Sequence, residues 1–270
     1  MKTLKEHTLI YDDECPMCRE YTKAFVKTGM LDKNGRVAYT TVVASDIPNV
    51  DWTRARNEIT LVNKQDHTVM YGVDSMVTVI GHSIPWLKPV LLWRPLYKIL
   101  RLLYFFISYN RKVMAPGAVF EAENTCTPDM SYAYRWAYIV FAWLVTSSIL
   151  VPYSVLAAPL VPESTFLREF FICGGQIVFQ GIVVAFIRKD RIIHYLGNVM
   201  TISLGGALLL TPMLLLARFT QSPALFIGYF GAVVGVMFIE HIRRTAILEL
   251  PWLVSASWVL YRILILLIIL

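Results

Sequence analysis

The chain has 270 residues, of which 56% are hydrophobic and only 16% are charged. Soluble globular proteins carry about a quarter charged residues, so this composition is not that of an entirely soluble protein. The formal net charge is +6, but basic residues crowd beside apolar runs, as at Arg188, Lys189 and Arg191, and not among base-stacking aromatic residues. This distribution argues against nucleic-acid binding. The four cysteines are too few and too scattered for a disulfide framework.

The first 80 residues intersperse acidic, basic and apolar residues as a soluble domain does. Their hydrophobic periodicity and turn residues predict a series of short elements. These are a strand at 8–11, a helix from the cysteines to a stop at Gly29, a strand at 36–43, a looser stretch at 45–56, a hairpin of 58–62 with 68–71, and a helix at 75–80 capped by Asp74. This order predicts a small thioredoxin-like α/β domain.

The sequence Cys15-Pro-Met-Cys18 stands where the first strand gives way to the first helix. Backbone N–H groups and the dipole at a helix start stabilise a thiolate, and Pro16 suits the first helical turn. We therefore expect Cys15 to be the exposed, attacking thiol. Cys18, one turn further in, would release the mixed disulfide. The acidic residues Asp12, Asp13 and Glu14 oppose ionisation of Cys15 and favour a reducing or isomerising couple.

Other functions of the cysteine pair remain open at this point. A lone pair of cysteines is half a zinc site, and no second pair or histidine cluster at ligand spacing completes it. Copper delivery and a vestigial, inactive motif are further alternatives. The strand–cysteine–helix context favours redox chemistry without a metal or another cofactor. Cys126, in a polar stretch, and Cys173, in an apolar one, are not expected to take part in the couple.

A helix at 93–112 is amphipathic, with Arg94, Lys98 and Arg101 on one face and leucines on another. It suits packing on the soluble domain or contact with an anionic membrane surface. Residues 116–133 form a linker. The remainder, 134–270, predicts an all-α transmembrane bundle of about five helices, each near the ~20 residues needed to cross a bilayer. The expected spans are 135–158, 167–187, 194–217, 222–240 and 252–270.

Cationic clusters follow the second and fourth spans, at 188–191 and 243–244, whereas the intervening loops carry at most one arginine each. Cytoplasmic loops of membrane proteins are enriched in Lys and Arg, so we expect the N-terminal domain in the cytoplasm and the C-terminus outside. No signal-peptide pattern opens the chain. In the second span, Cys173, Gln176 and Gln180 share a face beside glycines, a pattern of close helix packing or of a ligand or quinone pocket.

The segment from Ile10 to Cys18 resembles the DCC family of thiol-disulfide oxidoreductases, which is named for an Asp-x-x-Cys-x-x-Cys signature; Asp12, Cys15 and Cys18 match it. Tyr71-Gly-Val-Asp74-Ser75 is similar to the family's Gly-x-Asp-Ala element, and the run from Tyr104 to Asn110-Arg111 is similar to its closing segment. The sequence departs from the family pattern at Asp13, where glycine is usual, and at Ser75, where alanine is usual. The likeness covers about residues 8–115.

From the residues and the resemblance together we expect a membrane-anchored protein-disulfide reductase or related thiol-disulfide oxidoreductase. Its partners would be protein or small-molecule thiols and disulfides, together with a lipid bilayer, the cell inner membrane being the expected one. Cys15, Cys18 and Asp12 are the expected catalytic residues, supported by Pro16 and Asp74. The alternative is a structural or transport membrane protein whose N-terminal domain is regulatory or redox-inactive.

Overall fold

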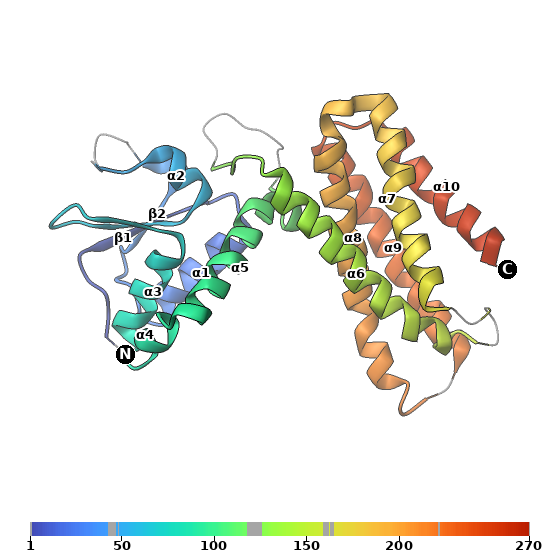
Figure 1. Cartoon of the computed structure of the whole chain (residues 1–270), viewed down its shortest axis with the longest axis horizontal. Coiled ribbons are helices and arrows are strands. Elements are labelled where there is room, and N and C mark those ends of the chain that lie inside the picture. The colour runs from blue at the N-terminus through green and yellow to red at the C-terminus, as the bar shows by residue number, and fades with distance from the viewer. Residues whose placement is uncertain are drawn as a thin grey trace. The chain divides into compact units, whose positions relative to one another are not determined.

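The computed structural model describes residues 2–42, 47, 49–117, 126–158, 162, 165–220 and 222–269. The chain divides into two compact units, Met1–Tyr134 and Arg135–Leu270. The first contains a small mixed sheet with helices, and the second contains long apolar helices (Figure 1). Both parts agree with the fold class expected from the sequence.

The first unit is built on a four-stranded sheet of order β2-β1-β3-β4. Strand β1 (His7–Tyr11) pairs in parallel with β2 (Arg36–Ala38) and antiparallel with β3 (Thr60–Asn63), which forms a hairpin with β4 (Val69–Tyr71). The strand at the cysteine motif is therefore central. Its buried Leu9 and Ile10 hold it in the core.

The helices of the first unit are α1 (Pro16–Lys27), α2 (Trp52–Asn57), α3 (Gly72–Ser83), α4 (Leu87–Leu91) and α5 (Arg94–Met114). Side chains of α1, α3 and α5, including Tyr21, Met76 and Tyr104, pack on the core that Leu9 and Leu61 form. These three helices therefore share one face of the sheet, and Figure 1 shows them gathered there.

Three details of the first unit differ from the sequence-based expectations. The strand predicted at 36–43 ends at Ala38, because Tyr39–Thr41 turns into a 3₁₀ helix; residue 43 lies outside the described residues. The stretch expected to be irregular contains α2, which Asp51 caps by accepting a hydrogen bond from the Arg54 amide at 3.1 Å. Helix α3 begins at Gly72, so Asp74 lies inside its first turn and is not the N-cap.

The second unit consists of α6 (Tyr132–Leu156, which starts in the first unit), α7 (Phe166–Arg188), α8 (Ile192–Leu216), α9 (Pro223–Ile247) and α10 (Trp252–Ile269). The five predicted spans fall on these five helices. Within the described residues, four segments are long and apolar enough to cross a membrane, because α7, the 3₁₀ turn η3 (Lys189–Arg191) and α8 count as one segment of 50 residues. That segment is folded back on itself, since α7 and α8 pack together.

Polar side chains of the second unit connect its helices. The Tyr195 hydroxyl donates to Gln180 at 2.7 Å and lies 2.9 Å from Nε2 of His241, whose Nδ1 is 3.2 Å from the Ser255 hydroxyl. A Cβ on Gly175 would lie 2.7 Å from the Tyr261 hydroxyl. The polar and small residues of α7 thus make interhelical hydrogen bonds and close contacts, in line with the helix-packing interpretation of this face.

Candidate redox site

The cysteine motif lies where β1 ends and α1 begins. Cys15 is the N-cap of α1, Pro16 occupies its first position, and the Arg19 amide donates to the Cys15 carbonyl at 3.0 Å. One carboxylate oxygen of Asp12 accepts from the amides of Glu14 at 3.1 Å and Cys15 at 3.2 Å. Asp12 thereby fixes the turn that brings Cys15 to the helix start, where the free N–H groups lie.

The two cysteines differ in ionisation in the way expected from the sequence. A hydrogen bond from the Cys18 thiol lowers the pKa of Cys15 from 9.0 to about 7, although burial raises it. The same hydrogen bond raises the pKa of Cys18, because it stabilises the protonated form, and burial raises that pKa further. At pH 7 about half of the reduced pairs therefore hold a thiolate at Cys15, with the shared proton on Cys18.

The exposure of the cysteines is the reverse of the expectation. Cys15 has 0% of its surface exposed, whereas Cys18 is half-buried and lines a cavity. The expectation that Cys15 lies open to solvent was therefore wrong. The motif itself places Cys15 at the helix start. Whether the Cys15 side chain is buried there depends on segments far along the chain, which the motif does not reveal.

The acidic residues before Cys15 are all engaged by polar or basic side chains. The other carboxylate oxygen of Asp12 lies 3.0 Å from Nε of Arg111 and 3.7 Å from Nζ of Lys112. Lys112 also pairs with Glu14 at 3.1 Å, and Asp13 accepts from the Thr40 hydroxyl at 2.8 Å. Two positive charges at the end of α5 thus offset the negative charge of Asp12 and Glu14. This compensation was not predicted from the sequence.

Arg111 holds several segments together beneath the cysteines. Its Nη2 donates to the carbonyl of Arg56 and to that of Cys126, both at 2.7 Å, and its Nη1 donates to the Ser108 hydroxyl at 3.0 Å. The Tyr104 hydroxyl, about two turns back along α5, accepts from the Ile59 amide at 2.8 Å. The backbone that leads into β3 is therefore fixed by α5. The Asn-Arg landmark was visible in the sequence, but its role at this site was not predicted.

Cys126 is buried beside this network, although it was expected in a polar linker. Its Sγ lies 3.4 Å from Nη2 of Arg111, and burial raises its pKa to about 12. Asp129 accepts a hydrogen bond from the Asn57 side chain at 2.7 Å. Residues 126–134 therefore pack on the first unit, and a fragment that ends at residue 115 would lose these contacts.

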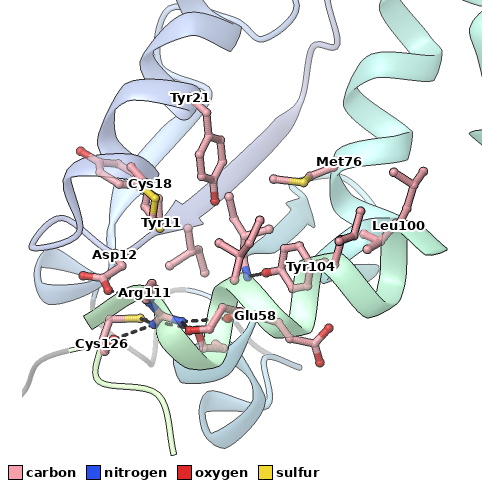
Figure 2. Close-up of a pocket in the computed structure, with 18 of the residues that line it drawn as sticks. Tyr11, Asp12, Cys18, Tyr21, Glu58, Met76, Leu100, Tyr104, Arg111 and Cys126 are labelled. Carbon is pink, nitrogen blue, oxygen red and sulfur yellow. Dashed lines mark hydrogen bonds and ion pairs between the residues drawn. The ribbon is translucent and has the colours of Figure 1, made fainter. Parts of the chain in front are cut away.

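A cavity of about 510 Å³ lies between the sheet and helices α1, α3 and α5. Cys18 lines it together with Asp12, Arg111 and Cys126, while the remaining wall is almost entirely apolar (Figure 2). Tyr21 and Tyr104 lie along it, and burial raises the pKa of both phenols, so they stay protonated at neutral pH. The dithiol thus borders a hydrophobic chamber.

Asp74, expected to support the site, faces another helix. Its carboxylate accepts from the Tyr97 hydroxyl at 2.7 Å, which ties α3 to α5, and it does not line the cavity beside Cys18. Its neighbour Gly72 has a φ of +57° and packs against Glu58 and the Tyr104 ring. Ser75, where the family usually has alanine, donates to the Met70 carbonyl at 2.8 Å.

No group of three or more His, Cys, Asp or Glu side chains that could hold a metal ion occurs within the ranges that the structure describes. The arrangement at the β1–α1 junction offers two thiols of unequal acidity and a charged network that stabilises the turn between them. Such a pair can cycle between a dithiol and a disulfide.

Residues 9–115 match the family model described as DCC1-like thiol-disulfide oxidoreductase. The N-terminal unit therefore carries a domain of this family, and four helical segments capable of spanning a membrane follow it within the described residues. Neither the curated proteins nor the solved structures compared with the chain gave a match.

Proposed function

We propose that the protein is a membrane-anchored thiol-disulfide oxidoreductase, acting as a protein-disulfide reductase through the Cys15–Cys18 couple on a thioredoxin-like domain. The observation that carries the proposal is the position of Cys15 as N-cap of α1, hydrogen-bonded by Cys18 and with its pKa lowered to about 7. A structural cysteine pair has no need of this asymmetry, whereas thiol exchange requires one sulfur as thiolate near neutral pH.

The residues at the site take distinct roles in this proposal. Cys15 holds the negative charge, and Cys18 gives and takes the proton through their shared hydrogen bond. Asp12 positions Cys15 through the turn and keeps Arg111 in place. Pro16 starts the helix without requiring a hydrogen-bond acceptor. Asp74 is a supporting residue because its bond to Tyr97 holds α5, and with it Arg111, against the domain.

Contacts within the second unit support a proposed membrane topology. Tyr138, early in α6, hydrogen-bonds Thr201, early in α8, at 2.7 Å, and Tyr153, late in α6, bonds the carbonyl of Phe226 at the start of α9. Tyr261, at the middle of α10, donates to the Ile172 carbonyl in the first third of α7. The start of α6 therefore lies at the same end of the unit as the α7–α8 turn and the end of α9.

That end also carries both cationic clusters, since Arg191 lies 3.6 Å from Glu249, just after α9. We infer five crossings, with the domain that precedes α6 on the cationic, cytoplasmic side of the cell inner membrane and the end of α10 outside. The domain would then meet thiols and disulfides of proteins or small molecules in the cytoplasm.

The competing function is a structural or transport protein whose N-terminal domain is redox-inactive. A redox titration of the full chain in detergent, against dithiol–disulfide buffers and with alkylation mass shifts as readout, separates the two. We expect one two-electron transition that is lost in Cys15→Ser and in Cys18→Ser but retained in Cys173→Ser. Insulin reduction by the full chain should follow the same pattern. Absence of a transition in the unaltered chain would refute the oxidoreductase and favour its competitor.

A further inference from the structure

The cavity beside Cys18 has the size and lining of a ligand site. Its volume of about 510 Å³ lies within the range of pockets that bind small molecules, roughly 300–1,000 Å³. Most of its lining residues are aliphatic or aromatic, including Met76, Ile80 and Leu100. Cys18 lies at the end of the cavity that Asp12 and Arg111 also line (Figure 2), and Glu58 and Ser108 are the other residues with charged or small polar side chains in its wall. An apolar chamber with one chemically active end is suited to an apolar molecule that carries a reactive head.

The rim of the cavity is exposed and apolar. Leu103 and Ile107 line the cavity and are also 50% and 45% exposed, so the cavity opens to the surface beside them. Further exposed apolar residues lie on α5 and on the segment around α4 that precedes it, namely Ile99 and Leu102 on α5, Leu92 and Trp93 between α4 and α5, and Trp86 just before α4. Exposed apolar residues on a helix that also carries Arg94, Lys98 and Arg101 are typical of contact with a bilayer surface. Molecules dissolved in a membrane could thus enter from it.

We propose that this cavity binds the alkyl part of an apolar thiol or disulfide, whose sulfur exchanges with Cys18. The proposal rests on the proposed oxidoreductase function and names its substrate class. Its geometric basis is that Cys18 lines the chamber, whereas Cys15 is fully buried and does not. For a substrate in the chamber, the roles expected from the sequence are therefore exchanged, with Cys18 as the attacking thiol and Cys15 as the resolving one.

The exchange balances as follows in the reducing direction. Cys18 attacks one sulfur of the substrate disulfide and passes its proton to the Cys15 thiolate, while the substrate S–S bond breaks and one thiolate leaves and takes a proton from water. Cys15 then loses its proton and attacks the Cys18 sulfur, which forms the protein disulfide and expels the second substrate thiolate, protonated in turn. The substrate disulfide has gained two electrons and two protons and become two thiols; the protein supplied both electrons and the one proton that Cys18 carried, and water supplied the other proton.

Matched dialkyl disulfides test this in the reduced full chain in detergent. The rate of Cys15–Cys18 disulfide formation, measured by mass spectrometry after alkylation, is compared for dioctyl and diethyl disulfide. The cavity variants are Leu103→Trp and Ile107→Trp, and the control is Leu102→Trp, which lies beside Leu103, is 61% exposed and does not line the cavity. Partitioning of the probes into micelles affects all variants equally, so it cancels when their rate ratios are compared.

We expect the dioctyl-to-diethyl rate ratio to fall about tenfold, equivalent to 1.4 kcal/mol, in both cavity variants. Leu102→Trp should keep the ratio of the unaltered chain. In Cys15→Ser, the hydrogen bond and charge of Cys15 no longer raise the pKa of Cys18, so Cys18 can ionise at alkaline pH; an octylthio adduct should then accumulate on it, because the resolving thiol is missing. Equal ratios in all variants, with the dithiol still oxidised by diethyl disulfide, would overturn the substrate class and leave the oxidoreductase intact. An octylthio adduct on Cys15 in Cys18→Ser would overturn the entry route. Failure of both probes to oxidise the dithiol would overturn both proposals.

Discussion

Asp12 and Arg111 stand 99 positions apart in the sequence and meet as a buried ion pair at 3.0 Å. Asp12 belongs to the turn that precedes Cys15, and Arg111 belongs to the last turn of α5. The pair therefore joins the two ends of the family domain directly beneath the dithiol. Its charges act on Cys15 in opposite directions, since Asp12 raises the pKa of that thiol and Arg111 lowers it.

The ion pair can be tested by neutralising each partner. Asn at position 12 keeps an oxygen that can accept from the Cys15 amide, so Asp12→Asn should retain the turn and lower the pKa of Cys15 below 7. Arg111→Met should raise that pKa and destabilise the domain by about 3–5 kcal/mol, because Asp12 is left buried without its partner. Thiolate absorbance against pH and denaturant unfolding provide the two readouts. A shift of the Cys15 pKa in the same direction in both variants would contradict this account.

The pH dependence of thiol reactivity follows from the pKa of Cys15 near 7. The alkylation rate of Cys15 should rise about tenfold per pH unit below pH 7 and level off above about pH 8, as the thiolate fraction saturates. The fold lowers this pKa from 9.0, so ionisation of Cys15 stabilises the folded state above about pH 9 and loses this effect as pH falls through 7. Site-resolved mass spectrometry over pH 5–10 checks the profile, and a midpoint near 9 would show that Cys18 does not activate Cys15.

Gly72 should not tolerate a side chain. Its φ of +57° is unfavourable for other residues, and a Cβ there would collide with the Glu58 carboxylate and lie 3.1 Å from the Tyr104 ring. We expect Gly72→Ala to cost about 1–3 kcal/mol of folding stability. Gly117→Ala is a suitable control, because the nearest atom to its Cβ would be 3.6 Å away. Equal thermal denaturation of the two variants would contradict the assigned role of Gly72.

Cys126 should remain outside the redox couple although it lies beside Arg111. Its pKa of about 12 keeps it protonated at neutral pH, and its thiol donates to the carbonyls of Ala55 and Arg56 rather than to a thiolate that could take its proton, as Cys15 can take that of Cys18. The midpoint potential of the full chain should therefore change by less than about 30 mV in Cys126→Ser, which corresponds to 1.4 kcal/mol for two electrons. Cys173→Ser should give the same result. A larger shift in Cys126→Ser alone would include that thiol in the couple.

The topology predicts opposite locations for two reporters. A reporter fused after Leu270 should be active only outside the membrane, and one inserted in η3, between α7 and α8, only in the cytoplasm. Cytoplasmic activity of the C-terminal reporter would contradict either the orientation or the inference that α7 and α8 each cross.

The sequence was sufficient to predict the elements whose pattern is local. The β1–α1 junction, the β3–β4 hairpin and the five long apolar helices follow from periodicity and turn residues within about 25 positions. The burial of Cys15, the pairing of Asp12 with Arg111 and the position of Cys126 could not be predicted from local pattern. The ion pair joins residues 99 positions apart, and Cys126 contacts residues 70 and 71 positions before it. The short helix α2 was missed although Asp51 is a capping residue, since Pro48 nearby indicated a loop.

The link between Asp12 and Arg111 also sets an order of events during synthesis. Asp12, Cys15 and Cys18 leave the ribosome early, but the guanidinium that neutralises Asp12 follows almost 100 residues later. Until Arg111 emerges, burial of the Asp12 carboxylate is costly, so the dithiol segment remains open to solvent and to cellular oxidants. Closure of the redox site therefore coincides with the approach to the ribosome exit of α6, the first described helix that is long and apolar enough to cross a membrane. Maturation of the soluble domain and the start of membrane insertion then take place in the same interval.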